Sequence, residues 1–457
     1  MKIEQFFLDC LAQDSYLIAD EAAGVAIVVD PRRDIDIYLE VAEELGVTIT
    51  HSVLTHFHAD FVAGHIELRD RIGAKIALGS AAEADYEFVG LKDGETLHVG
   101  EVRVQVLHTP GHTPEGISLL VFENADAEEP TAVLTGDTLF IGDVGRPDLM
   151  ASVGVTAEEL ASWLYDSLHE KLLPLPDKTL VYPGHGAGSL CGRALSDEKV
   201  STMGEQRQYN YALAPMDKET FIELVTADQP PAPEYFAYDA GLNKSERPSM
   251  LAASEAMTLE EVLKAVAEGA QLLDVRESGS FAAKHMTGAT NIGLNGQFAS
   301  WVGSILDPHR AIVVVADPGE EENALIRLGR VGFDNVSGHL DGGMASLEGR
   351  DDLMQSFERY APNTLREELS GSAGRTLIDI RRTPELLEGT LPGSIHIPLD
   401  EIQSRLHEIP KDQPVTVYCA GGYRSAVAAS ILQREGFTDV TDIVGGYSAW
   451  AATEPVA

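Results

Sequence analysis

The 457-residue chain has few cysteines and few basic residues, and both shortages limit what it does. Three cysteines are too few for a disulfide framework, so we expect Cys10, Cys191 and Cys419 to be free thiols in a reducing, cytoplasmic compartment. Lys and Arg number 33 against 73 Asp and Glu, which gives a formal net charge of −40. Such an acidic surface repels phosphate backbones and anionic lipids, so neither nucleic-acid binding nor membrane docking is expected as the main activity.

Long apolar runs are also missing from the sequence. No stretch reaches the roughly 18 apolar residues that a membrane helix needs, and the N-terminal residues lack the basic head and apolar core of a signal peptide. With 44% hydrophobic and 23% charged residues, the composition is that of an ordinary globular protein. At roughly 150 residues per domain, the length allows about three domains.

Histidine and aspartate follow several predicted strands in the first 190 residues. Strands are predicted at 49–54, 102–107, 131–135 and 180–182, and a polar loop follows each of them. The loops contribute, in order, His56, His58, His112, Asp137 and His185. Imidazole nitrogens and a carboxylate that converge at the edge of a sheet suit zinc, iron or manganese.

The order and spacing of these motifs resemble the metallo-β-lactamase superfamily over about residues 1–225. The resemblance implies an αββα sandwich of two sheets with metals at one edge. The first motif of that family is His-x-His-x-Asp-His, but Phe61 takes the sixth position here. Phenylalanine cannot bind the second metal that this histidine would bind, so we expect one metal. One alternative stays open, in which Asp60, His185 and water still hold a second ion.

A single metal would be held by His56, His112 and Asp137, which leaves three coordination positions open. That arrangement is typical of non-haem Fe(II) enzymes that use O₂, and zinc is the alternative metal. His58, together with Asp60 and His185, is then expected to orient ligands or substrate from behind the metal ligands.

The pattern, with the segment 136–148, is similar to the persulfide dioxygenase branch of the superfamily. This resemblance implies Fe(II), O₂ and a low-molecular-weight persulfide, R–S–SH, which is oxidised to sulfite and R–SH. A cation near the metal would hold the sulfur anion, and Arg146 is the first candidate, with Arg193 and Arg207 weaker ones. For each arginine an ordinary surface ion pair stays open. Cys191 is expected near the metal, either as a sulfur relay or as a buried structural thiol.

The rest of the chain repeats itself. Residues 272–276, 332–336 and 342–346 match later segments at offsets of 105, 104 and 103. Two copies of one α/β domain are therefore predicted, each a parallel sheet wrapped by helices. We therefore expect four parts in the chain: the histidine-rich domain at 1–228, a proline-rich linker at 229–254, the first copy at 255–368 and the second copy at 369–457.

In the second copy, a strand at 415–418 runs into Cys419 and a glycine-rich loop. The loop lets backbone N–H groups point inward, and a helix from about residue 425 adds its dipole. A thiol in such a loop has a lowered pKa and acts as a nucleophile. The predicted persulfide loop consists of Ala420, Gly421, Gly422 and Tyr423, and the predicted catalytic residues are Cys419 and the cation Arg424.

Cys-x₄-Arg at a strand–helix junction resembles the rhodanese family of sulfurtransferases. In the first copy Asp317 stands where the second copy has Cys419, so the first copy is expected to be inactive. The whole chain then resembles the persulfide dioxygenase–sulfurtransferase fusions, with an α/β multidomain fold. The resemblance implies that Cys419 passes sulfane sulfur to sulfite, which gives thiosulfate.

Two other functions stay open. One is a dinuclear zinc thioesterase of the glyoxalase II type fused to a sulfurtransferase. The other is a sulfur-carrying module whose metal domain is structural. The sequence does not identify the thiol that carries the persulfide. A homo-oligomer is also open, because exposed helices on such sandwiches often pair.

Overall fold

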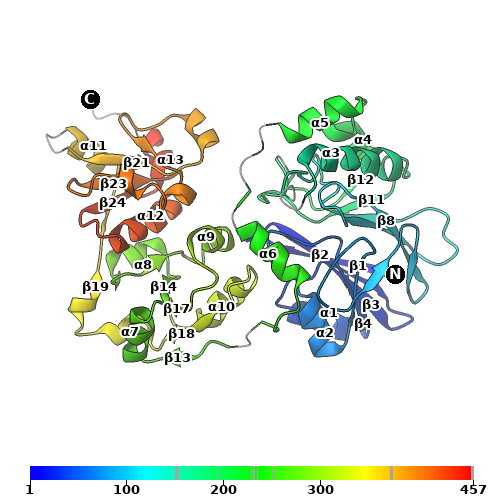
Figure 1. Cartoon of the computed structure of the whole chain (residues 1–457), viewed down its shortest axis with the longest axis horizontal. Helices are drawn as coiled ribbons and strands as arrows, with labels where there is room; N and C mark the ends of the chain where they lie inside the picture. The colour runs from blue at the N-terminus through cyan, green and yellow to red at the C-terminus, as the bar shows by residue number, and fades with distance from the viewer. Residues whose placement is uncertain are drawn as a thin grey trace. The chain divides into compact units, whose positions relative to one another are not determined.

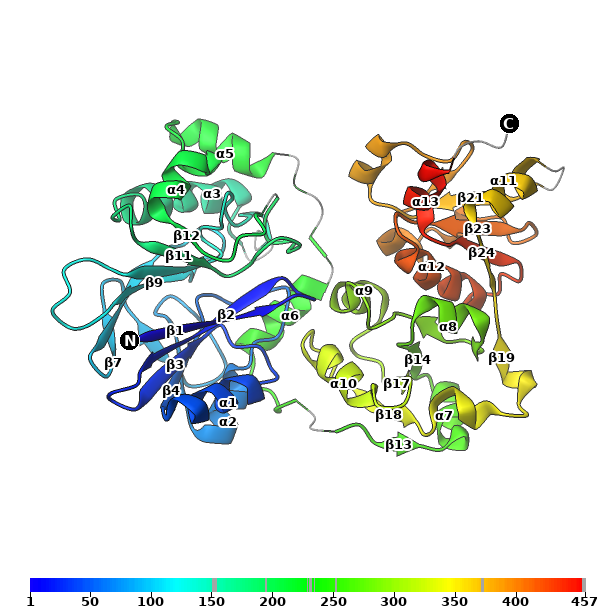
Figure 2. The same cartoon turned by 180° about the vertical axis from the view of Figure 1, so that it is seen from behind.

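The computed structural model consists of two compact units, shown from opposite sides in Figures 1 and 2. The first unit holds residues 1–250 and 329–332, and the second holds 251–328 and 333–457. The structure describes residues 1–149, 154–193, 195–227, 229, 232–233, 235–250, 253–370 and 374–453.

Two six-stranded sheets form the framework of the first unit. The first sheet contains, in spatial order, β1 (Lys2–Leu8), β2 (Gln13–Asp20), β3 (Val25–Val29), β4 (Thr48–Val53), β5 (Lys75–Gly79) and β6 (Val89–Leu91). The second contains β12 (Ser201–Thr202), β11 (Leu180–Pro183), β10 (Ala132–Gly136), β9 (Ile117–Phe122), β8 (Val102–His108) and β7 (Thr96–Val99). The helices are α1 (Asp36–Leu45), α2 (His65–Ile72), α3 (Ala157–Asp166), α4 (Met203–Tyr209), α5 (Lys218–Thr226) and α6 (Tyr235–Lys244).

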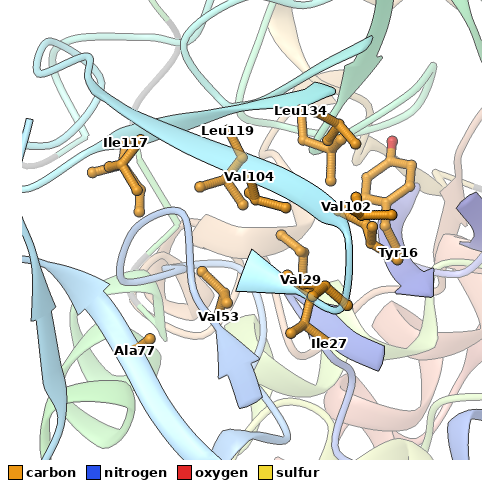
Figure 3. Close-up of a cluster of buried hydrophobic side chains, with 14 of the residues drawn as sticks. Tyr16, Ile27, Val29, Val53, Ala77, Val102, Val104, Ile117, Leu119 and Leu134 are labelled. Carbon is orange, nitrogen blue, oxygen red and sulfur yellow. The ribbon is translucent and has the colours of Figure 1, made fainter. Parts of the chain in front are cut away.

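The main core of this unit lies between the two sheets (Figure 3). Side chains alternate between the faces of a strand, so Ile27 and Val29 point into this core while Ala26 and Val28 face the side where α1 packs. The outer face of the second sheet packs against α3 and α5 in the same way. Helices therefore cover both sheets, which confirms the predicted αββα sandwich.

Local sequence signals account for the helix ends in the first unit. Helix α3 begins with a capping box, because the Thr156 side chain accepts from Glu159 N while the Glu159 side chain accepts from Thr156 N. Helix α1 ends at Gly46, whose φ of 65° is a left-handed conformation that glycine adopts at low cost.

The second unit contains two five-stranded parallel sheets built on one plan. The first is ordered β13 (Ala256–Met257), β18 (Val336–Leu340), β17 (Ile312–Val315), β14 (Gln271–Asp274) and β16 (Thr290–Asn291). The second is ordered β20 (Glu358–Tyr360), β24 (Val440–Ile443), β23 (Val415–Tyr418), β21 (Thr376–Asp379) and β22 (Ile395–His396). The strands of the two copies appear in the same spatial order, so the predicted internal repeat is confirmed.

Helices pack around both sheets of the second unit (Figures 1 and 2). In the first copy they are α7 (Leu259–Ala267), α8 (Ser278–Ala283), α9 (Phe298–Ile305) and α10 (Glu321–Gly329). In the second copy they are α11 (Pro362–Ser370), α12 (Tyr423–Arg434) and α13 (Gly446–Ala452). A short antiparallel pair, β15 (His285–Met286) with β19 (Met354–Gln355), completes the unit. Among the described residues, no helix has the length and apolar character needed to span a bilayer.

The segment predicted as a proline-rich linker differs from expectation, because part of it is the helix α6. Asn243 of this helix is buried, and its Nδ2 donates to the carbonyls of His58 and Phe61 at 2.8 Å each. Its Oδ1 accepts from Ala63 N at 2.8 Å. Residues of this helix therefore pack against the first unit and hold the loop after β4. The domain boundaries stay predictions, and the second junction near 370–374 includes residues outside the described ranges.

We predict that Asn243→Ala destabilises the first unit by about 1–3 kcal/mol, because it leaves buried backbone groups unsatisfied. Thermal unfolding of the full chain and hydrogen exchange of residues 55–64 measure the effect. Ser245→Ala, directly after the same helix, removes only a hydroxyl bonded to the Gly241 carbonyl and is the control. Equal exchange rates in the two variants would contradict the assigned function of Asn243.

Candidate functional site

Asp137 lies at the centre of a buried cluster at the ends of β4, β8, β10 and β11. Its Oδ2 is 3.8 Å from His56 Nε2 and 3.6 Å from His112 Nε2. These separations are too long for hydrogen bonds. They are close to the roughly 3–3.5 Å between two ligands of one ion at about 2.1 Å each. The three side chains form a buried group whose ligand atoms all lie within 4.8 Å of one another.

Glycines let the backbone approach Asp137 closely. A Cβ on Gly184 would lie 2.3 Å from Asp137 Oδ1, and one on Gly136 would lie 2.5 Å from Thr55 Oγ1. The Pro-Gly-His and Thr-Gly-Asp motifs therefore carry glycine because a side chain there would displace the carboxylate or the residue before His56.

Hydrogen bonds fix the proton positions of His56. Asp30 accepts from Thr55 N and from Thr55 Oγ1, both at 2.8 Å. The hydroxyl of Thr55 donates its one proton to Asp30, so it accepts from His56 Nδ1 at 2.9 Å. Nδ1 therefore carries the hydrogen, and the lone pair of Nε2 points toward Asp137. Burial and the neighbouring His58 hold the pKa of His56 well below its ordinary value, so the ring is neutral.

His112 is oriented in the same sense. Its Nδ1 lies 2.9 Å from the backbone carbonyl of Arg146, which can only accept. Nδ1 therefore donates to this carbonyl, and Nε2 is the ring nitrogen that faces Asp137. Two imidazoles and one carboxylate, each fixed by partners behind them, fit a divalent metal ion.

His58 does not belong to this group, and the reason lies in its neighbours. Its Nε2 is 3.0 Å from Asp30 Oδ1. The ring of Phe61 is fully buried and packs against the ring of His58, with centroids 4.4 Å apart. Asp30 thus contacts His58 on one side and supports His56 through Thr55 on the other.

His185 bridges two carboxylates. Its Nδ1 lies 2.9 Å from Asp137 Oδ1, and its Nε2 lies 2.9 Å from Asp60 Oδ2. Burial lowers the pKa of His185, but the two carboxylates outweigh burial and raise it well above its ordinary value. Conversely, burial raises the pKa of Asp137, and the surrounding histidines outweigh burial and hold it well below its ordinary value. The predicted trio of His58, Asp60 and His185 thus lies around the metal-binding group.

Cys191 lies beside this cluster, in a second buried group with Asp60 and His185. Burial and the carboxylates of Asp60 and Asp137 raise the pKa of its thiol well above the ordinary value. Cys191, a free cysteine, is therefore held in its protonated thiol form.

Two of the three arginines named as candidates for substrate binding have clear partners. The side chain of Arg146 is buried and paired with Asp148 at 2.7 Å, and its backbone carbonyl accepts from His112 Nδ1 at 2.9 Å. Arg207 donates to the Leu173 carbonyl at 2.7 Å and pairs with Asp177. Leu173 and Asp177 lie outside the His–Asp cluster, and substrate binding by either arginine stays a prediction.

Cys419 lies at the end of β23, buried at the base of a tight loop. Gly422 has a φ of 93° and directs its N–H to Cys419 Sγ at 3.0 Å. The carbonyls of Cys419 and Ala420 accept from Tyr447 N and Ser448 N at 2.7 and 3.0 Å, which fixes the loop from behind.

The predicted catalytic Arg424 and the predicted loop residue Tyr423 both have partners that the sequence did not indicate. Arg424 makes a bidentate pair with Glu385, at 2.7 and 2.5 Å. Tyr423 starts helix α12, and its hydroxyl donates to the Gly293 carbonyl of the first copy at 2.7 Å. Helix α12 thus begins two residues earlier than expected.

Three supporting residues carry no signal that spacing could detect. Asp30 accepts from Thr55, and Asn243 accepts from a backbone N–H of the loop after β4. Glu115 accepts from Phe57 N at 2.9 Å. Only Asp30 leaves a trace, as a carboxylate directly after the apolar strand β3.

Comparisons with known proteins agree with this geometry. A profile of the "Metallo-beta-lactamase superfamily" matches residues 8–185, and one of the "Rhodanese-like domain" matches 258–349 and 361–453. The crystal structure of a metallo-beta-lactamase from Staphylococcus aureus subsp. aureus COL is 32% identical, with a TM-score of 0.64, and covers 74% of this chain and 98% of its own. The chain belongs to the metallo-beta-lactamase superfamily. Two rhodanese-like domains follow its superfamily domain.

Relatives of this superfamily domain include enzymes named for two different activities. The mitochondrial persulfide dioxygenase ETHE1 of Bos taurus is 29% identical over 237 residues, which cover 50% of this chain and 82% of the relative. The cytoplasmic hydroxyacylglutathione hydrolase of Arabidopsis thaliana is 36% identical over 188 residues, or 40% of this chain and 67% of the relative. The comparisons therefore establish a superfamily member of the hydrolase or dioxygenase type, fused to rhodanese-like domains.

We predict that Thr55→Val lowers the metal affinity about 10- to 100-fold, because His56 loses the acceptor that fixes its tautomer. Competition with a chromophoric chelator measures this affinity without turnover. Thr48→Val, at an exposed position on β4, is the matched control and should bind metal like the parent. Equal affinities in both variants would show that the hydroxyl of Thr55 does not orient the ligand.

Proposed function

We propose that this chain is a persulfide dioxygenase coupled to a sulfurtransferase. The observation that carries the proposal is the arrangement at His58, where Phe61 packs on the ring and Asp30 faces Nε2. Two histidines and one carboxylate then face a single point, with the other positions open. That donor set suits one Fe(II) that takes both O₂ and a substrate.

The overall reaction is R–S–SH + O₂ + H₂O → R–SH + SO₃²⁻ + 2H⁺. When bound, Fe(II) would supply the electrons that activate O₂ and a coordination position for the sulfur. His56, His112 and Asp137 would hold it. His185 donates to the carboxylate of Asp137 and keeps its orientation. The buried surroundings limit access of water.

Cys419 performs the second step of the proposal. Its thiolate attacks the outer sulfur of a persulfide, the S–S bond of the donor breaks, and R–SH leaves with the proton. Sulfite then attacks the sulfane sulfur of Cys419–S–S⁻, which forms thiosulfate and returns the thiolate. The N–H of Gly422 faces the sulfur throughout. Sulfite is the product of one site and the acceptor at the other, and both sites share one chain.

A dinuclear zinc thioesterase is the second candidate, favoured by the hydroxyacylglutathione hydrolase similarity. Asp60 and His185 lie beside Asp137 and would have to hold the second ion. Phe61 opposes this function because it removes one of the ligands.

We predict that Cys419→Ser separates the two activities. With Fe(II) and glutathione persulfide as the probe, the parent should consume O₂ and release thiosulfate. The variant should consume O₂ at a similar rate but release sulfite, because no residue then carries sulfane sulfur. An oxygen electrode and separation of sulfite from thiosulfate by chromatography measure both outputs.

Two variants complete this experiment. Cys10→Ser changes a free thiol outside both sites and should leave both outputs unchanged. His112→Ala should abolish O₂ uptake yet still transfer sulfur from thiosulfate to cyanide. An iron-loaded parent that consumes no O₂, but hydrolyses a glutathione thioester, would refute the dioxygenase in favour of the hydrolase.

A further inference from the structure

The cavity at Cys419 has walls from both rhodanese-like copies. Its volume is about 590 Å³. The second copy contributes Arg382, Pro384, Glu385, Cys419, Gly421, Tyr423 and Arg424, and the first copy contributes Asn295, Gly296, Gln297 and Trp301. The first copy, which has no cysteine in its loop, therefore forms part of the cavity that contains Cys419 of the second copy.

Close packing fixes this shared wall. Tyr423 donates to the Gly293 carbonyl at 2.7 Å, and a Cβ on Gly296 would lie 3.2 Å from the Tyr423 ring. Ser430 of α12 accepts from Asn291 N at 2.9 Å. The two copies thus meet through specific hydrogen bonds beside the cavity, and the wall is part of the folded second unit.

The cavity is too large for an inorganic sulfur anion alone. One water molecule occupies about 30 Å³ in the liquid, so sulfite with its four heavy atoms fills a small part of the space. Cavities of about 300–1,000 Å³ are those that enclose organic ligands.

The chemistry of the lining points to the kind of organic ligand. Asn295 and Gln297 offer exposed amides that both donate and accept. Trp301 is 3% exposed and lies beside Arg382, whose guanidinium carbon is 5.9 Å from the ring centroid. Arg424 is already paired with Glu385. Amides match peptide groups of a ligand, and Arg382 matches a carboxylate.

We propose that the first rhodanese-like copy binds the organic carrier of the persulfide that loads Cys419. The ligand class is a small thiol persulfide with peptide-type amides and a carboxylate. Its outer sulfur reaches Cys419 Sγ while its carrier lies along Asn295, Gln297 and Trp301. The inference rests on the proposed sulfurtransferase function and assigns a substrate-binding function to the copy without a cysteine.

The test compares two sulfur donors with the full chain under anaerobic conditions, where O₂ chemistry is silent. Glutathione persulfide is the organic probe, thiosulfate is the inorganic one, and cyanide is the acceptor, so that thiocyanate reports each transfer. In Asn295→Ala/Gln297→Ala, the ratio of kcat/KM for the organic donor to that for thiosulfate should fall about fivefold or more, mainly through KM, because hydrogen bonds to the carrier are lost.

Gln355→Ala, at an exposed position outside the cavity, should keep the parent's ratio. Both changed residues of the double variant are also exposed, so the fold is expected to survive. An unchanged ratio in the double variant would overturn the inference while leaving the sulfurtransferase function intact. A parent that transfers sulfur from neither donor would instead overturn the proposed sulfurtransferase, and the inference with it.

Discussion

The carboxylate of Asp137 is the group on which the buried cluster of the first unit depends. One oxygen faces the Nε2 atoms of His56 and His112, and the other is 2.9 Å from His185. Without a cation, this carboxylate would be buried among neutral rings at a high cost in solvation. The protonated His185 on one side and a metal on the other offset that cost, so the same contacts that stabilise the fold also define the site.

The surrounding structure serves to hold these ligands still. Glycines at 136 and 184 allow close backbone approach, and Asp30 orients His56 through Thr55. Helix α6 holds the loop after β4 through Asn243, from about 180 residues further along the chain. A side chain at position 184 would displace the carboxylate of Asp137, and one at position 136 would displace Thr55, which supports His56.

Much of the fold and the grouping of His56, His112 and Asp137 were predictable from the sequence, because they leave patterns in spacing. The strands before His56, His112 and Asp137 follow from apolar runs, and the repeat follows from constant offsets. Asn243 and Asp30 were not predictable as supports, since a side chain that bonds to a distant backbone leaves no periodicity. The partners of Arg207 and Tyr423 likewise depend on tertiary packing, which joins the hydroxyl of Tyr423 to a carbonyl of the first rhodanese-like copy.

The number of metal ions that each chain binds decides between a mononuclear and a dinuclear site. Anaerobic titration of the metal-free protein with Fe(II), followed by metal analysis after gel filtration, gives this number. We predict saturation at one ion per chain, because Phe61 and the contact between His58 and Asp30 leave three donors facing one point. Saturation at two ions per chain, for iron or for zinc, would contradict it and support the hydrolase.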